Sequence, residues 1–107
     1  MEFSHQELDI IQQTVNERYG QPVELQLADT ELRLDPDSPH LTECPAVYWE
    51  ARNCHFVISK ISDERFHCQF FYGRKEHYGT GRREYDDLAQ CVITLLQLQA
   101  DHEAKSN

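Results

Sequence analysis

The chain has 107 residues, of which 39% are hydrophobic and 27% are charged. This composition is typical of one globular domain and excludes a disordered chain. The net charge of −9 disfavours nucleic acid and anionic membranes as partners and favours a basic protein. Most of it lies in residues 1–50, which hold eleven acids and two arginines, whereas residues 51–107 hold eight acids and eight bases.

The first predicted element is a helix that begins after Ser4. Ser4 and Glu7 have the spacing of a capping box, and Phe3 and Leu8 occupy the positions of a hydrophobic staple. One apolar face follows at helical spacing, and a glycine and a proline then end the helix: Leu8, Ile11, Val15, Tyr19, Gly20 and Pro22.

Residues 23–34 alternate between apolar and polar side chains, which predicts two short strands or one bent strand. The next segment, residues 35–45, contains three prolines and is predicted to be a loop within the same domain. The β-rich centre begins at Val47.

A hairpin is predicted for the strands on either side of residues 62–65. An odd loop with a bulge places Phe56 and Ile58 opposite Phe70 and Cys68, on one apolar face. The same parity sends Cys54 and Cys68 into the core and turns three polar side chains outward: His55, His67 and Gln69.

Asp86 or Asp87 is predicted to cap a final helix. Its apolar residues cover about 220° of the helical wheel, at about 100° per residue. A helix that packs on a single sheet needs a narrower apolar stripe, only somewhat above about 100°. This helix therefore either lies between the sheet and the first helix or contacts another chain. In the second case Ile93, Leu96 and Ala100 would bind a partner or a second copy. The tail from about residue 101 is expected to fray.

These elements predict a single α+β domain over residues 1–107. An N-terminal helix, a four- to five-stranded antiparallel sheet and a C-terminal helix follow one another, with both helices on one face of the sheet.

Residues 72–87 concentrate glycine and basic side chains. Gly79 and Gly81 provide two glycines of a phosphate-binding motif, but Glu84 occupies the third position and two aspartates follow. The favoured interpretation is a turn, a return strand at residues 76–78 and a bend before the helix. The alternative is an anion or nucleic-acid site built from Arg74, Lys75, Arg82 and Arg83, which interleave with three tyrosines.

No metal, cofactor or catalytic site is predicted. The cysteines at positions 44, 54, 68 and 91 form no Cys-x-x-Cys pair, and adjacent strand residues such as Cys54 and His55 point to opposite faces. The spacing of His40 and Cys44 is the remaining metal candidate. The N-terminus has no secretory signal, so reduced thiols and a cytoplasmic location are expected. Asp35 and Asp37 resemble solvated turn carboxylates rather than a catalytic pair.

The sequence therefore predicts a small acidic interaction module that binds a partner and is not an enzyme. An inhibitor, an immunity-type protein, an adaptor and an assembly chaperone all fit this description. The predicted contact residues are Glu24, Glu31, Asp35 and Asp37, together with Ile93 and Leu96. The alternative is a small ligand- or nucleic-acid-binding domain that uses residues 72–85.

Overall fold

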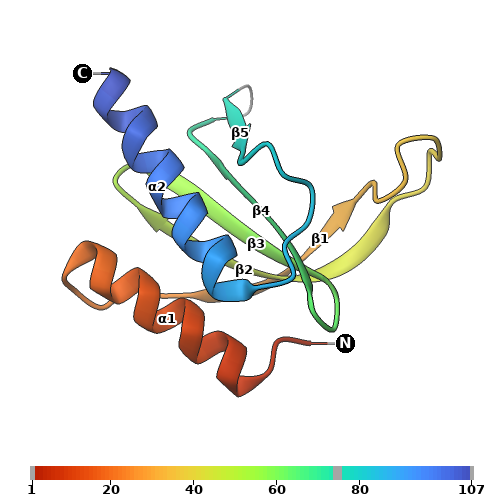
Figure 1. Cartoon of the computed structure of the whole chain (residues 1–107), viewed down its shortest axis with the longest axis horizontal. Coiled ribbons are helices and arrows are strands. Elements are labelled where there is room, and N and C mark those ends of the chain that lie inside the picture. The colour runs from red at the N-terminus through yellow and green to blue at the C-terminus, as the bar shows by residue number, and fades with distance from the viewer. Residues whose placement is uncertain (1, 74–75, 107) are drawn as a thin grey trace.

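The computed structural model describes residues 2–73 and 76–106 of the chain. Two helices flank an antiparallel meander in the order β1-β2-β3-β4-β5. The elements are α1 (His5–Tyr19), β1 (Gln26–Leu32), β2 (Thr42–Ala51), β3 (Cys54–Ser62), β4 (Arg65–Phe71), β5 (His77–Gly79) and α2 (Leu88–Ser106). Both helices lie on one face of the sheet (Figure 1), which confirms the predicted α+β arrangement. In the described part of the chain, neither helix is long and apolar enough to span a bilayer.

The N-terminal helix begins and ends where its caps predict. Ser4 Oγ accepts a hydrogen bond from Glu7 N at 3.1 Å, and Glu7 Oε1 accepts one from Ser4 N at 2.7 Å. Gly20 ends the helix with φ of 66°, a left-handed conformation that glycine adopts without strain. Ile11 and Val15 are fully buried.

The central hairpins have the predicted parity. Phe56 lies opposite Phe70 and Ile58 opposite Cys68, and the register shifts between Lys60 and Ser62, as expected for a bulge. The turn between β2 and β3 consists of Arg52 and Asn53, both with positive φ, which is typical of two-residue hairpin turns.

The core lies between the helices and one face of β2, β3 and β4. Trp49 and Phe56 are fully buried and stack with ring centroids 5.1 Å apart. The opposite face of these strands is not covered by a helix. It carries His55, His67 and Gln69, all half-buried, as predicted.

The segment before β2 differs from the prediction. β2 begins at Thr42, so residues 42–45 of the expected loop form a strand that pairs with β1. Pro45 is tolerated because the pairing of β2 with β3 begins only at Ala46. One side of β2 therefore faces no neighbouring strand at this position. Of the two alternatives predicted for residues 23–34, two short strands or a single strand, the structure has the single strand β1.

The described part of the glycine-rich segment forms the predicted return strand, bend and cap, and the predicted turn falls on residues 74–75, which lie outside the described residues. β5 pairs with the end of β4, and Gly81 bends the chain with φ of 85°. Tyr85 then forms an isolated bridge to Phe66. Asp87 Oδ1 accepts a hydrogen bond from Gln90 N at 3.2 Å and caps α2.

The C-terminal helix corrects two expectations. Leu96 is only 4% exposed and belongs to the core, because α2 packs against both the sheet and the neighbouring helix α1. The wide apolar stripe is therefore used within the chain and gives no reason to expect a dimer through Leu96. The segment from residue 101, expected to fray, is helical to Ser106. The His102 ring packs on Tyr78 and Tyr72, with centroids 4.3 Å and 5.3 Å away.

All four cysteines are buried free thiols. Burial raises the pKa of Cys54 to about 11 and also raises the pKa of Cys44, while a hydrogen bond with Cys68 and burial raise that of Cys91. Because the thiolate is the reactive form, we expect slow alkylation of the native protein at pH 8 and rapid modification of all four thiols in denaturant. Mass spectrometry after timed iodoacetamide treatment measures this. Fast native labelling of Cys54 would contradict its buried position.

Candidate functional site

The hairpin of β1 and β2 extends beyond the helices (Figure 1). Leu27 lies opposite the core residue Val47, so Leu27 belongs to the face that the helices cover elsewhere. Two and four residues further along this face, Asp29 lies opposite Pro45 and Glu31 opposite Glu43. The core-side face of the sheet thus continues, uncovered, into residues 27–45, which we call the acidic arm.

The acidic arm exposes both apolar surface and negative charge. Leu27 is 70% exposed, and Asp29, Glu31 and Glu43 are exposed beside it. Directly opposed like charges in an antiparallel pair repel each other, so Glu31 and Glu43 destabilise the hairpin unless a cation joins them. Within residues 2–73 and 76–106, none of the five acids of the arm forms an ion pair.

A groove of about 460 Å³ lies at the base of the arm. Its walls are Glu2 and Phe3 on one side and residues 27–29 and 43–46 on the other. The Lys60 ammonium fixes the first wall by donating a hydrogen bond to the Glu2 carbonyl at 2.9 Å. Three acids line the groove, and none of its described lining residues is basic. An apolar side chain flanked by lysine or arginine would complement this groove.

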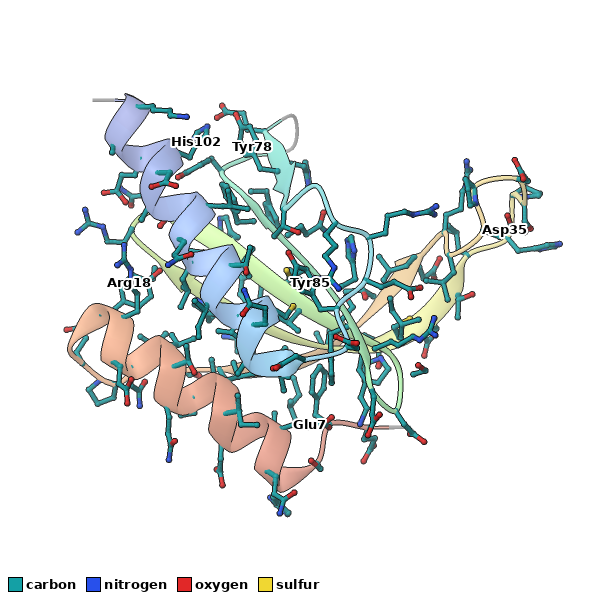
Figure 2. The ribbon with its side chains drawn as sticks, in the orientation of Figure 1. Glu7, Arg18, Asp35, Tyr78, Tyr85 and His102 are labelled. Carbon is teal, nitrogen blue, oxygen red and sulfur yellow. The ribbon has the colours of Figure 1, made fainter. Side chains whose placement is uncertain are left out.

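The structure separates the acids that the sequence grouped. Glu31 lies on the acidic arm, and Asp35 and Asp37 lie in its tip (Figure 2), where Asp37 N donates to Asp35 Oδ1 at 2.9 Å. Glu24 lies before β1 and lines a different groove. Sequence reasoning missed Asp29 and Glu43 as site residues. The strand pairing would have identified them, had residues 42–45 been recognised as a strand.

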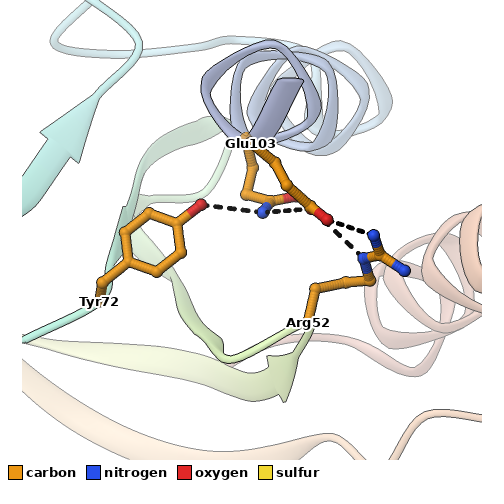
Figure 3. A network of polar contacts seen from close by, with 4 residues as sticks. Arg52, Tyr72 and Glu103 are labelled. Atoms are coloured by element: carbon orange, nitrogen blue, oxygen red, sulfur yellow. Dashed lines mark hydrogen bonds and ion pairs between the residues drawn. The ribbon is translucent and has the colours of Figure 1, made fainter. Parts of the chain in front are cut away.

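The second groove, of about 650 Å³, lies between the C-terminal parts of both helices and the β2–β3 turn. Arg52 pairs with Glu103, and Gln99 Nε2 donates to Tyr72 Oη at 3.0 Å and Glu103 Oε2 at 3.2 Å (Figure 3). The hydrogen bond from Arg52 holds the pKa of Glu103 below its usual value. Burial raises the pKa of Tyr19, also in this groove, to about 12. Charges of both signs meet here, so the groove favours neither a cationic nor an anionic ligand.

Arg82 and Arg83 of the glycine-rich segment already have partners within the chain. The Arg82 guanidinium lies 4.8 Å from the centroid of the Tyr85 ring, and Arg83 Nη2 donates to the Leu34 carbonyl at 3.3 Å. Tyr85 is 3% exposed, which leaves little ring surface for a base to stack on. Arg74 and Lys75, the other two residues of the alternative site, lie outside the described residues. The described part of this segment thus offers weak support for an anion site.

The uncovered face of the sheet carries a row of four rings: Tyr48, His55, Phe71 and His77. Neighbouring rings are 4.9–5.8 Å apart and within 23° of parallel. The faces that neighbouring rings turn toward each other are therefore covered, and the two inner rings, His55 and Phe71, have a ring against both faces. Proteins that bind single-stranded nucleic acid need exposed ring faces, so this row is poorly suited to that role.

Metal ligands do not gather in the described part of the chain, where no group of three His, Cys, Asp or Glu side chains converges. His40 is exposed, whereas Cys44 is buried and donates to the Thr42 carbonyl at 3.6 Å. The Cys54 thiol is buried on the core side while His55 lies on the opposite face, as the strand parity predicts.

No known family model, curated protein or solved structure matches this chain. The fold and its surface define a small α+β protein with an uncovered acidic hairpin. Its function is therefore inferred from the chemistry of that surface.

Proposed function

We propose that this chain is an interaction module that binds a basic segment of another protein through the acidic arm, and that it acts by binding rather than by catalysis. An inhibitor, an immunity-type protein, an adaptor and an assembly chaperone all remain within this class. The main support for this proposal is that the core-side face of the sheet continues uncovered into the acidic arm. There the exposed Leu27 lies among Asp29, Glu31 and Glu43.

Two features of this surface support a basic partner. The opposition of Glu31 and Glu43 creates a local repulsion that a lysine or arginine would remove. The net charge of −9 would also accelerate the approach of a basic protein by electrostatic steering. The alternative, a ligand- or nucleic-acid-binding domain using residues 72–85, is disfavoured by the contacts that Arg82 and Arg83 make within the chain and by the buried Tyr85.

The test is a selection of random peptides on the immobilised protein. We expect enrichment of peptides that combine lysine or arginine with an apolar residue. Their affinity should fall steeply with salt, because screening weakens exposed charge pairs. In the variant Asp29→Asn/Glu31→Gln/Glu43→Gln, the Kd of the best peptide should rise about tenfold or more, equivalent to about 1.4 kcal/mol. Fluorescence anisotropy at low and high salt measures both effects.

The matched control is Asp9→Asn/Glu17→Gln/Asp101→Asn, which changes the net charge equally at exposed positions on the two helices. It should retain most of the affinity. Equal losses in both variants would mean that only net charge matters and would contradict the assignment to the arm. Loss of binding in Arg82→Gln alone would instead favour the alternative segment.

A further inference from the structure

The outer edge of β1 is an unpaired strand edge. In the order β1-β2-β3-β4-β5, β1 hydrogen-bonds only to β2 among the described strands. Every second residue of such a strand directs its backbone N–H and C=O away from the sheet. The strand is seven residues long, and Gln26 to Asp29 are all exposed. The edge therefore offers hydrogen-bonding groups to another extended segment.

The protection of this edge against strand addition rests on the negative charge of Asp29 and Glu31. Proteins also shield edges with lysine, proline, bulges or very short strands. All seven residues of β1 are described, and they include no lysine or proline and pair with β2 without a register shift. The opposite edge, β5, is only three residues long. Of the two edges, β1 is thus the one that could accept a full strand.

The charges on β1 decide which strand can be added. Asp29 and Glu31 lie on the same face as Leu27, and like charges on neighbouring strands are destabilising. A second copy of β1 would bring its own two acids to this face, so self-pairing is disfavoured. A strand with lysine or arginine at alternate positions would pair favourably with the same residues.

Resting on the proposed function, we infer that the partner segment binds as a sixth strand, antiparallel to β1, with the pattern basic-x-basic-x-apolar. Antiparallel addition continues the existing sheet and is slightly more stable per residue than parallel addition. The first basic residue then faces Glu31, the second faces Asp29, and the apolar residue covers Leu27. The intervening residues lie on the other face, beside Ala28 and Thr30, where small or polar side chains fit.

Two synthetic peptides of identical composition test this inference. The first contains Lys-Thr-Lys-Thr-Leu, which places its three key side chains on one face of a strand. The second contains Lys-Lys-Leu-Thr-Thr, which distributes them over both faces, since successive strand residues alternate. We expect the first peptide to bind about tenfold more tightly, equivalent to about 1.4 kcal/mol. A version of the first peptide in which every backbone nitrogen is methylated should bind much more weakly, because it lacks backbone donors.

Amide hydrogen exchange of the complex then identifies the binding mode. Strand addition should slow exchange at alternate residues of β1, either at Gln26, Ala28 and Thr30 or at Leu27, Asp29 and Glu31. Equal binding of both peptides, or no alternating protection, would overturn strand addition while leaving a charge-dependent interaction intact. If neither peptide binds in a way that depends on Asp29, Glu31 and Glu43, the proposed function itself fails.

Discussion

Leu96→Glu is expected to abolish cooperative folding, whereas Ile93→Glu should leave the protein nearly as stable as the original. Leu96 is 4% exposed within the core, and Ile93, one turn earlier on the same helix, is 42% exposed. Placing an unpaired carboxylate in the core costs several kcal/mol. The free energy of unfolding of a typical domain is roughly 5–15 kcal/mol, so this cost is a large fraction of it. An exposed substitution such as Ile93→Glu changes stability by about 0.5 kcal/mol or less.

Circular dichroism during chemical denaturation measures this difference. The less drastic variant Leu96→Ala should still fold, with a loss of about 3 kcal/mol, and it provides a measurable value if Leu96→Glu yields no folded protein. Similar midpoints for Leu96→Glu and Ile93→Glu would mean that Leu96 is accessible. The sequence-based interpretation of this residue as a partner contact would then regain its support.

The second large effect is expected at a buried ion pair that joins the sheet to α1. Lys60 Nζ lies 2.7 Å from Glu7 Oε1, and the Lys60 and Glu7 side chains are 7% and 16% exposed. The same carboxylate oxygen accepts the hydrogen bond from Ser4 N in the capping box. Lys60→Met leaves this carboxylate without its cation, and we expect a loss of about 3 kcal/mol of unfolding free energy.

Two further variants test the cause of that loss. Lys60→Met/Glu7→Gln removes both charges and keeps a side chain suited to the capping box, so it should recover most of the lost stability. Lys105→Met removes an exposed lysine from α2 and should have little effect. If the double variant is no more stable than Lys60→Met, the stabilisation comes from packing of the lysine stem rather than from the ion pair.

Lys60 also links stability to the candidate site. Its ammonium contacts the Glu2 carbonyl, and Glu2 and Phe3 form one wall of the groove beside the acidic arm. Loss of Lys60 therefore releases this wall as well as the start of α1. We expect Lys60→Met to weaken peptide binding less than neutralisation of Asp29, Glu31 and Glu43, because those charges remain on the arm.

Local signals in the sequence determined the elements that depend on neighbouring residues. The capping box at Ser4 and the stop at Gly20 define α1, because the groups that satisfy helix ends lie within one turn of them. The parity of Phe56, Ile58, Cys68 and Phe70 defines the central hairpin. A strand exposes alternate residues to opposite faces, so only one register buries all four.

Contacts between residues far apart in the chain were decided by the tertiary structure. The prolines of residues 35–45 indicate a loop, yet Thr42–Pro45 forms a strand because β1 supplies its hydrogen bonds on one side and no strand lies on the other. The apolar stripe of α2 was equally compatible with a partner and with α1. Packing against both α1 and the sheet buries Leu96 and leaves Ile93 exposed.

The candidate site also combines features that the sequence determines with features that only the tertiary structure determines. Composition alone predicts an acidic N-terminal half and a basic partner, since charge adds along the chain whatever its fold. Which acids act together depends on strand register, and register places Glu31 opposite Glu43 while it leaves Glu24 beside another groove. The pairing of Glu31 with Glu43 cannot be predicted from composition, because these residues, twelve positions apart, become neighbours only when the β1–β2 hairpin forms.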